Sequence, residues 1–130
     1  MIKIVDDILL LTGSFIIFVW GVAHIIPVKS VVKGFGEISR DNRLIITMEW
    51  IAEGLTLCFI GVLVFLVVSM AGTTESCSYI VGWASAIMLL CMAGVTLFTG
   101  VRTSIVPIKV CPAVKIAVAL LFILALTIFS

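Results

Sequence analysis

The chain has 130 residues and a formal net charge of +1, and 63% of its residues are hydrophobic whereas only 12% are charged. Soluble domains have about 45–50% apolar and about 25% charged residues, and a domain of this size leaves much of its chain exposed. With a mean hydropathy of +1.41, the composition excludes a water-soluble enzyme, a disordered chain and a disulfide-bonded mini-protein. It indicates an integral membrane protein. The balanced charge argues against nucleic acid as a partner, because nucleic-acid binding needs a clustered basic face.

Four apolar runs are long enough to cross a membrane as helices, since a spanning helix needs about 20 apolar residues. The first run has no Lys, Arg, Asp or Glu, the second contains two glutamates, and the third has no formal charge. None of them alternates as a transmembrane β-strand does, so we expect an all-α fold. The expected spans are residues 8–27, 44–70, 79–101 and 110–129.

The connecting segments are short, so neighbouring helices must be antiparallel. The sequence therefore predicts a single membrane domain folded as a four-helix up-and-down bundle. Seven of the eight basic residues lie on the side of connections 28–43 and 102–112, and only Lys3 lies opposite. By the positive-inside rule these connections are expected to be cytoplasmic and both termini outside, in the inner or plasma membrane. The seven residues are Lys29, Lys33, Arg40, Arg43, Arg102, Lys109 and Lys115.

The connection 28–43 mixes apolar residues with these bases. Gly34 and Gly36 weaken any continuous helix there. We expect an interfacial segment that lies on the cytoplasmic headgroups, where its basic side chains gain from anionic lipid. A binding lid over the bundle is the alternative.

Three ionisable residues, His24, Glu49 and Glu53, fall at membrane depth, where such side chains are costly and indicate function. Counted along their helices, Glu49 lies about 7 Å, Glu53 about 14 Å and His24 about 5 Å from the cytoplasmic end. The two glutamates are four residues apart and share one helical face, so one of them is expected to carry a proton. This arrangement suits a proton relay or an acid/base pair. The chain has a single histidine, so we expect no metal site.

Structural roles remain open for each of these residues. Glu49 lies near enough in sequence to Arg40 and Arg43 to form an interfacial ion pair, and His24 can act as a simple hydrogen-bonding group. Trp20 and Trp50 fall near the same level as His24 and Glu49. They are candidates to wall a pocket for a flat apolar ligand such as a quinone or an isoprenoid, or else pack in the bundle.

The first two spans resemble those of DoxX-like small membrane proteins. The resemblance covers residues 8–65 and rests on Leu11-x-Gly13-x-Phe15, on Gly21-Val-Ala-His24-Ile-Ile-Pro27 and on Glu49-Trp-Ile-Ala-Glu53-Gly54 with Gly61 downstream. It implies a four-helix membrane bundle. Some members of that family are linked to thiosulfate:quinone oxidoreduction and to redox-stress membrane complexes, so the resemblance implies a redox setting.

Three functions fit these observations. The first is an accessory or binding subunit of a membrane redox complex. The second is a membrane enzyme or binder for a lipophilic substrate, with Glu53 and Glu49 as acid/base and His24 as the orienting group. The third is a proton-coupled transporter that works as an oligomer. The expected partners are the lipid bilayer and either further copies of the chain or a larger membrane complex. The sequence shows no haem, flavin or nucleotide motif and identifies neither a cofactor nor a substrate.

Overall fold

The computed structural model describes residues 2–127, with side chains described for residues 4–127. Every regular element in this part of the chain is a helix. The order is α1 (Ile2–Ile25), α2 (Val28–Gly34), α3 (Arg40–Ala71), α4 (Ser76–Thr99), the 3-10 turn η1 (Gly100–Arg102) and α5 (Val106–Thr127).

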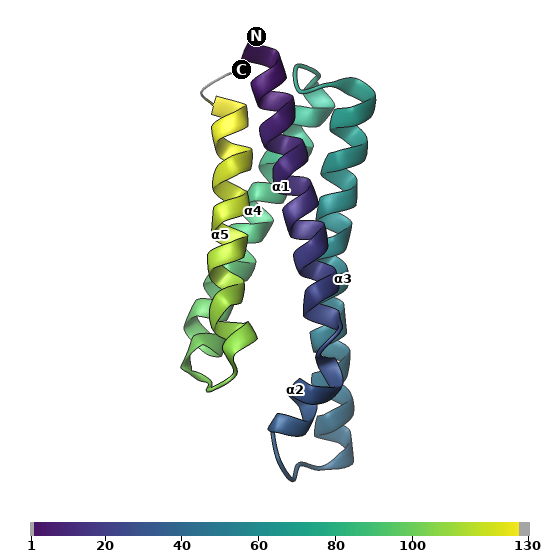
Figure 1. Cartoon of the computed structure of the whole chain (residues 1–130), viewed down its shortest axis with the longest axis vertical. Helices are drawn as coiled ribbons and strands as arrows, with labels where there is room; N and C mark the ends of the chain where they lie inside the picture. Colours follow the sequence, from purple (N-terminus) through teal and green to yellow (C-terminus); the bar gives the residue numbers. More distant parts are fainter. Residues whose placement is uncertain (1, 128–130) are drawn as a thin grey trace.

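Four of these helices, α1, α3, α4 and α5, are long and apolar enough to cross a membrane. They run up and down with short connections, and both ends of the chain lie at one end of the bundle (Figure 1). The predicted all-α, four-span fold is therefore confirmed, and the chain is a multi-pass membrane protein.

The helix ends differ from the expected spans for local reasons. α1 includes Asp6 and Asp7 because Asp7 has a partner at this end of the bundle: its Oδ1 accepts from the backbone N–H of Thr73 at 3.0 Å and from the Thr73 hydroxyl. α3 begins at Arg40, where the Ser39 hydroxyl accepts from the backbone N–H of Asn42 and caps the helix.

The last two spans also shift. α4 ends at Thr99 and continues as η1, which covers two residues of the expected third span. α5 starts four residues earlier than expected, and Pro107 is tolerated there because the first helical turn needs no N–H. Residues 128 and 129 of the expected fourth span lie outside the described residues.

The connection 28–43 contains the short helix α2, which packs against α3. Val31 and Val32 are buried in that contact. Helix α2 ends at Gly34, and the chain then turns at Gly36, whose φ of 72° is in the left-handed region that favours glycine. The expected interfacial segment is thus partly helical.

Small residues let α1 and α3 approach closely. A Cβ atom on Gly61 would lie 2.6 Å from the backbone oxygen of Ser14, and one on Gly21 would lie 2.7 Å from the backbone oxygen of Gly54. Glycines at such contacts allow two backbones to pack directly. α1 and α3 therefore form one tight pair.

Helices α4 and α5 form the second pair, whereas α3 and α4 contact each other less. The two pairs diverge toward the end of the bundle away from the termini (Figure 1). The core between them contains fully buried apolar side chains from all four spans, among them Leu10, Leu57, Leu89 and Phe122.

Candidate functional site

An ion pair joins α3 to α5 inside the bundle. The Lys115 ammonium group donates to Oε1 of Glu53 and, at 3.1 Å, to the hydroxyl oxygen of Thr96 on α4. The Lys115 side chain is fully buried, whereas that of Glu53 is 30% exposed. Lys115 lies nine residues past Val106, about 14 Å along α5, so its charge is placed at membrane depth.

His24 approaches the same carboxylate from α1. Its Nε2 atom lies 3.5 Å from Oε2 of Glu53, and its ring is buried. The imidazole stacks on the indole of Trp50 with the ring centroids 4.2 Å apart, and the Trp50 N–H donates to the His24 backbone oxygen. Among the described residues neither ring nitrogen of His24 has a hydrogen-bond partner.

Cys111 completes the surroundings of Glu53. Its thiol lies 3.7 Å from Oε1 of Glu53 and accepts from the indole N–H of Trp20 at 3.4 Å. Side chains from α1 and α5 thus meet at the carboxylate of Glu53 on α3, and Thr96 on α4 joins them through Lys115. We call the set His24, Glu53, Thr96, Cys111 and Lys115 the polar cluster.

A cavity of about 490 Å³ opens beside the polar cluster and shares Glu53 and Thr96 with it. We call it the α3/α4 cavity. Glu49 and Glu53 both line it, so the two glutamates share a face as their spacing predicts. Its other lining residues are Ile45, Ile46, Trp50, Ala52, Thr56, Val95, Thr96, Thr99, Gly100 and Ile108.

The donors that line this cavity are already in use. The hydroxyls of Thr56, Thr96 and Thr99 donate to the backbone oxygens four residues earlier, at 2.7–2.9 Å. The indole N–H of Trp50 donates to His24. The carboxylates and the hydroxyl oxygens can still accept. The cavity therefore presents hydrogen-bond acceptors and negative charge to whatever enters it.

The structure brings some of the predicted site residues together and separates others. His24 contacts Glu53 and not Glu49. The sequence favours Glu49 as the partner, because its expected depth is closer to that of His24 than the expected depth of Glu53 is. The exposed side chain of Glu49 forms no ion pair with Arg40 or Arg43. Trp50 lines the α3/α4 cavity, whereas Trp20 packs on Cys111 and the core and does not line it.

Lys115 corrects the interpretation of the sequence. The sequence places it among the cytoplasmic bases, but it is fully buried and pairs with Glu53, so it says nothing about orientation. The signal that could have found it is its position inside the expected span 110–129. A base within one span predicts an acid within another, because neither charge is stable alone in a membrane.

The described residues contain no group of three His, Cys, Asp or Glu side chains close enough to hold a metal ion. The Lys115 ammonium group also balances the charge that Glu53 would offer to a cation. The chemistry that the polar cluster supports is therefore hydrogen bonding, charge pairing and proton exchange.

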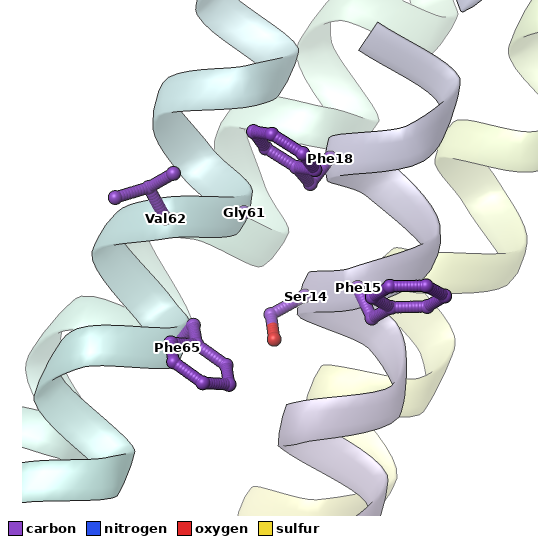
Figure 2. Close-up of a pocket in the computed structure, with 6 residues that line it drawn as sticks. All are labelled: Ser14, Phe15, Phe18, Gly61, Val62 and Phe65. Atoms are coloured by element: carbon purple, nitrogen blue, oxygen red, sulfur yellow. The ribbon is translucent and has the colours of Figure 1, made fainter. Parts of the chain in front are cut away.

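A second groove, of about 220 Å³, lies between α1 and α3 (Figure 2). Three phenylalanines, Phe15, Phe18 and Phe65, line it with Val62, Gly61 and Ser14. Ser14 supplies its only polar side chain, and that hydroxyl donates to the backbone oxygen of Leu11 at 2.8 Å. This surface fits contact with lipid acyl chains and lacks the means for chemistry.

Four apolar helices and an intramembrane polar cluster define a multi-pass membrane protein with a charged centre. Comparison of the chain with protein-family models, with curated proteins and with solved structures finds no match. The observations that bear on function are therefore the geometry of the polar cluster and the composition of the α3/α4 cavity.

Proposed function

We propose that this protein binds the polar head of a lipophilic molecule in the α3/α4 cavity, as an accessory or binding subunit of a membrane redox complex. One observation carries the proposal. The Glu53 side chain is 30% exposed and lines the cavity, while the side chain of Lys115, whose ammonium group balances it, is fully buried. The carboxylate is thus held in place from one side and left open to a ligand on the other.

The unused polar groups of the cavity favour a head that donates hydrogen bonds. Glu49 and Glu53 offer carboxylate oxygens as acceptors. The threonine hydroxyls and the Trp50 indole N–H already donate to backbone oxygens of the protein. A quinol, an isoprenoid alcohol or a lipophilic amine brings the missing donors. An oxidised quinone offers only acceptors and leaves the cavity's acceptors unpaired, which is unfavourable when water is displaced.

The dimensions suit such a ligand. Small-molecule sites have volumes of about 300–1,000 Å³ and are mostly apolar with a few polar groups. A further cavity of about 250 Å³ shares Glu53, Val95 and Thr96 with the first and continues along α4 past Met88 and Met92. An apolar tail has room there once the head contacts Glu53.

The redox setting rests on the resemblance of residues 8–65 to DoxX-like proteins. The subunit role also accords with the α3–α4 connection, which is only four residues long, 72–75. We propose that the chain acts within a larger membrane complex or an assembly of several copies.

The proposed orientation places the α2 end of the bundle in the cytoplasm of a cell with an inner or plasma membrane. With Lys115 removed from the count, six bases still lie near that end, in the segments 28–43 and 102–109. The opposite end has acidic residues, Asp6, Asp7 and Glu75. This asymmetry follows the positive-inside rule.

Acid–base chemistry is a second candidate, favoured by the 3.5 Å approach of His24 Nε2 to Glu53 Oε2. A proton can pass between these atoms once they close to hydrogen-bond distance, while Lys115 holds the carboxylate in position. In an enzyme or a proton-coupled transporter, this exchange is expected to depend on His24, whereas binding alone depends on the two glutamates. His24→Gln separates the candidates. If the protein is an enzyme or a proton-coupled transporter, this variant loses turnover or proton flux. If the protein only binds its ligand, this variant retains the ligand as the wild type does.

The first test is to identify what copurifies with the protein. The protein is extracted gently from its own membrane, purified and treated with organic solvent, and the small molecules released are identified by mass spectrometry. We expect a hydroxyl- or amine-bearing lipophile that is depleted in Glu49→Gln and retained in the control Glu75→Gln at the other end of the bundle. Equal retention by the two variants, or recovery of phospholipid alone, would contradict the proposal.

A further inference from the structure

A second charged cavity, of about 420 Å³, lies between α2 and α3 and is separate from the polar cluster. We call it the α2/α3 cavity. Three of its six lining residues are basic and the others are apolar or neutral: Val28, Lys29, Val32, Lys33, Arg43 and Thr47. It shares none of them with the α3/α4 cavity, so it stands independently of the proposed function.

The three bases converge without a protein partner. Lys29 and Lys33 are four residues apart on α2 and share a face, and Arg43 faces them from the first turn of α3. Within the described residues none of the three forms an ion pair or a side-chain hydrogen bond, although Glu37 and Asp41 are close in sequence. Three like charges at one cavity repel one another, so an anion bound among them is stabilised.

The place of this cavity indicates the source of the anion. α2 connects two spans at the end of the bundle, and Val31 and Val32 bury its apolar face against α3. A helix in that position lies where lipid headgroups begin. Basic residues next to a membrane attract anionic headgroups.

We infer that the α2/α3 cavity binds the phosphate of an anionic phospholipid headgroup. The planar guanidinium of Arg43 is able to donate two parallel hydrogen bonds to one phosphate, and the ammonium groups of Lys29 and Lys33 supply further charge. Val28, which is half-buried, lines the same cavity and provides apolar contact for the start of the acyl chains. The site fixes one lipid against α2 and so holds α2 on α3.

Native mass spectrometry tests this inference with the full chain. The protein is purified in micelles of a zwitterionic detergent, and phosphatidylglycerol or phosphatidylcholine is added in steps while bound lipids are counted. We expect one tightly held phosphatidylglycerol per chain and no tightly held phosphatidylcholine. In the variant Lys29→Gln/Lys33→Gln/Arg43→Gln we expect retention to fall at least tenfold.

A matched control removes the same charge outside the cavity. The variant Arg40→Gln/Arg102→Gln/Lys109→Gln loses three bases from the same end of the bundle, none of which lines the cavity. It is expected to keep its phosphatidylglycerol. Equal losses in the two triple variants would overturn the inference, because they would reflect general attraction to a basic surface.

Two further measurements keep the inference testable. Inorganic phosphate is added to the protein with bound phosphatidylglycerol, and displacement of the lipid by millimolar phosphate would overturn the assignment to a lipid. If the triple variant does not fold, Arg43→Lys preserves the charge and removes the bidentate contact. Its retention of phosphatidylglycerol is expected to fall, and unchanged retention would contradict the role of Arg43.

Discussion

The ammonium group of Lys115 on α5 contacts the carboxylate of Glu53 on α3 at a depth where neither charge is stable without the other. The approach of His24 and the hydroxyl of Thr96 extend this contact to α1 and α4. The Lys115–Glu53 pair thus joins the four spans, and Glu53 also lines the α3/α4 cavity. A substitution of Glu53 therefore changes both the stability of the bundle and the α3/α4 cavity, and its two effects must be measured separately.

Removing one partner of the buried pair is expected to destabilise the protein strongly. Lys115→Met leaves Glu53 without its counter-charge, and breaking a buried pair in this way costs about 3–5 kcal/mol. Replacing both partners with apolar residues, in Lys115→Met/Glu53→Leu, is expected to restore most of that loss. Thermal unfolding in detergent or in lipid nanodiscs measures both variants.

The control for this comparison is Lys109→Met, which removes an exposed base from the same helix. It is expected to change the unfolding temperature little. Glu53→Leu is measured alone as well, and a double variant as unstable as the sum of Lys115→Met and Glu53→Leu would show that the pair is not the source of the loss.

The close approach of α1 and α3 is expected to depend on Gly61. Gly61→Ala places a methyl group 2.6 Å from the backbone oxygen of Ser14, so the helices must separate, at a cost of about 1–3 kcal/mol for overpacking. Gly94 on α4 has no atom within 4 Å of an added Cβ, and Gly94→Ala is expected to be neutral or slightly stabilising. Equal unfolding temperatures for the two variants would contradict the packing described here.

The contact between Asp7 and Thr73 is expected to stabilise the end of the bundle that contains the termini. Thr73→Val keeps the side-chain shape but removes the hydroxyl that donates to Asp7. Hydrogen bonds to charged groups contribute about 1.5–3 kcal/mol, and a loss of that size is expected in equilibrium unfolding. The neighbouring exposed residue serves as the control: Thr74→Val should leave the unfolding free energy unchanged.

The proposed orientation predicts which thiol reacts from outside the cell. Cys77 is exposed at the start of α4, beside Glu75, whereas Cys111 is buried. A membrane-impermeant maleimide is expected to label intact cells through Cys77, and Cys77→Ser should abolish that labelling. Labelling that requires permeabilised cells would reverse the orientation.

The sequence predicts the spans well because apolar runs of this length have few alternatives in water or in lipid. The close contact of α1 and α3 also follows from residues visible in the sequence, the small side chains of Gly54, Cys58 and Gly61. Where helices begin and end is less predictable. Caps such as Ser39, and partners distant in sequence such as Thr73, decide those positions.

The site is predicted only in part. Intramembrane charge singles out His24, Glu49 and Glu53, and helical spacing places both glutamates on one face. Whether His24 contacts Glu53 or Glu49 depends on the axial position of α1 relative to α3. No local sequence pattern encodes that position. The position of Lys115 near the start of the expected fourth span indicates a surface base, whereas the packing of α5 turns it inward.

The measurement that tests the central claim most directly compares a ligand that has O–H donors with its methylated counterpart, which has none. A short-tailed quinol and its bis-methyl ether have the same ring and tail, but the ether has no O–H group. Calorimetric titration into nanodiscs, with empty nanodiscs subtracted, gives the affinity of each for the wild-type chain and for Glu49→Gln. Glu49 lines the cavity and has no ion-pair partner among the described residues, so this variant changes the site without breaking the Lys115–Glu53 pair.

We predict that the wild-type protein prefers the quinol by at least about tenfold, and that Glu49→Gln reduces the preference by about tenfold. That is the effect of losing one hydrogen bond to a charged group, worth about 1.5 kcal/mol. Equal affinities for the quinol and its ether, or a preference that Glu49→Gln leaves unchanged, would contradict the assignment of the α3/α4 cavity as a site for a hydrogen-bond-donating lipophile.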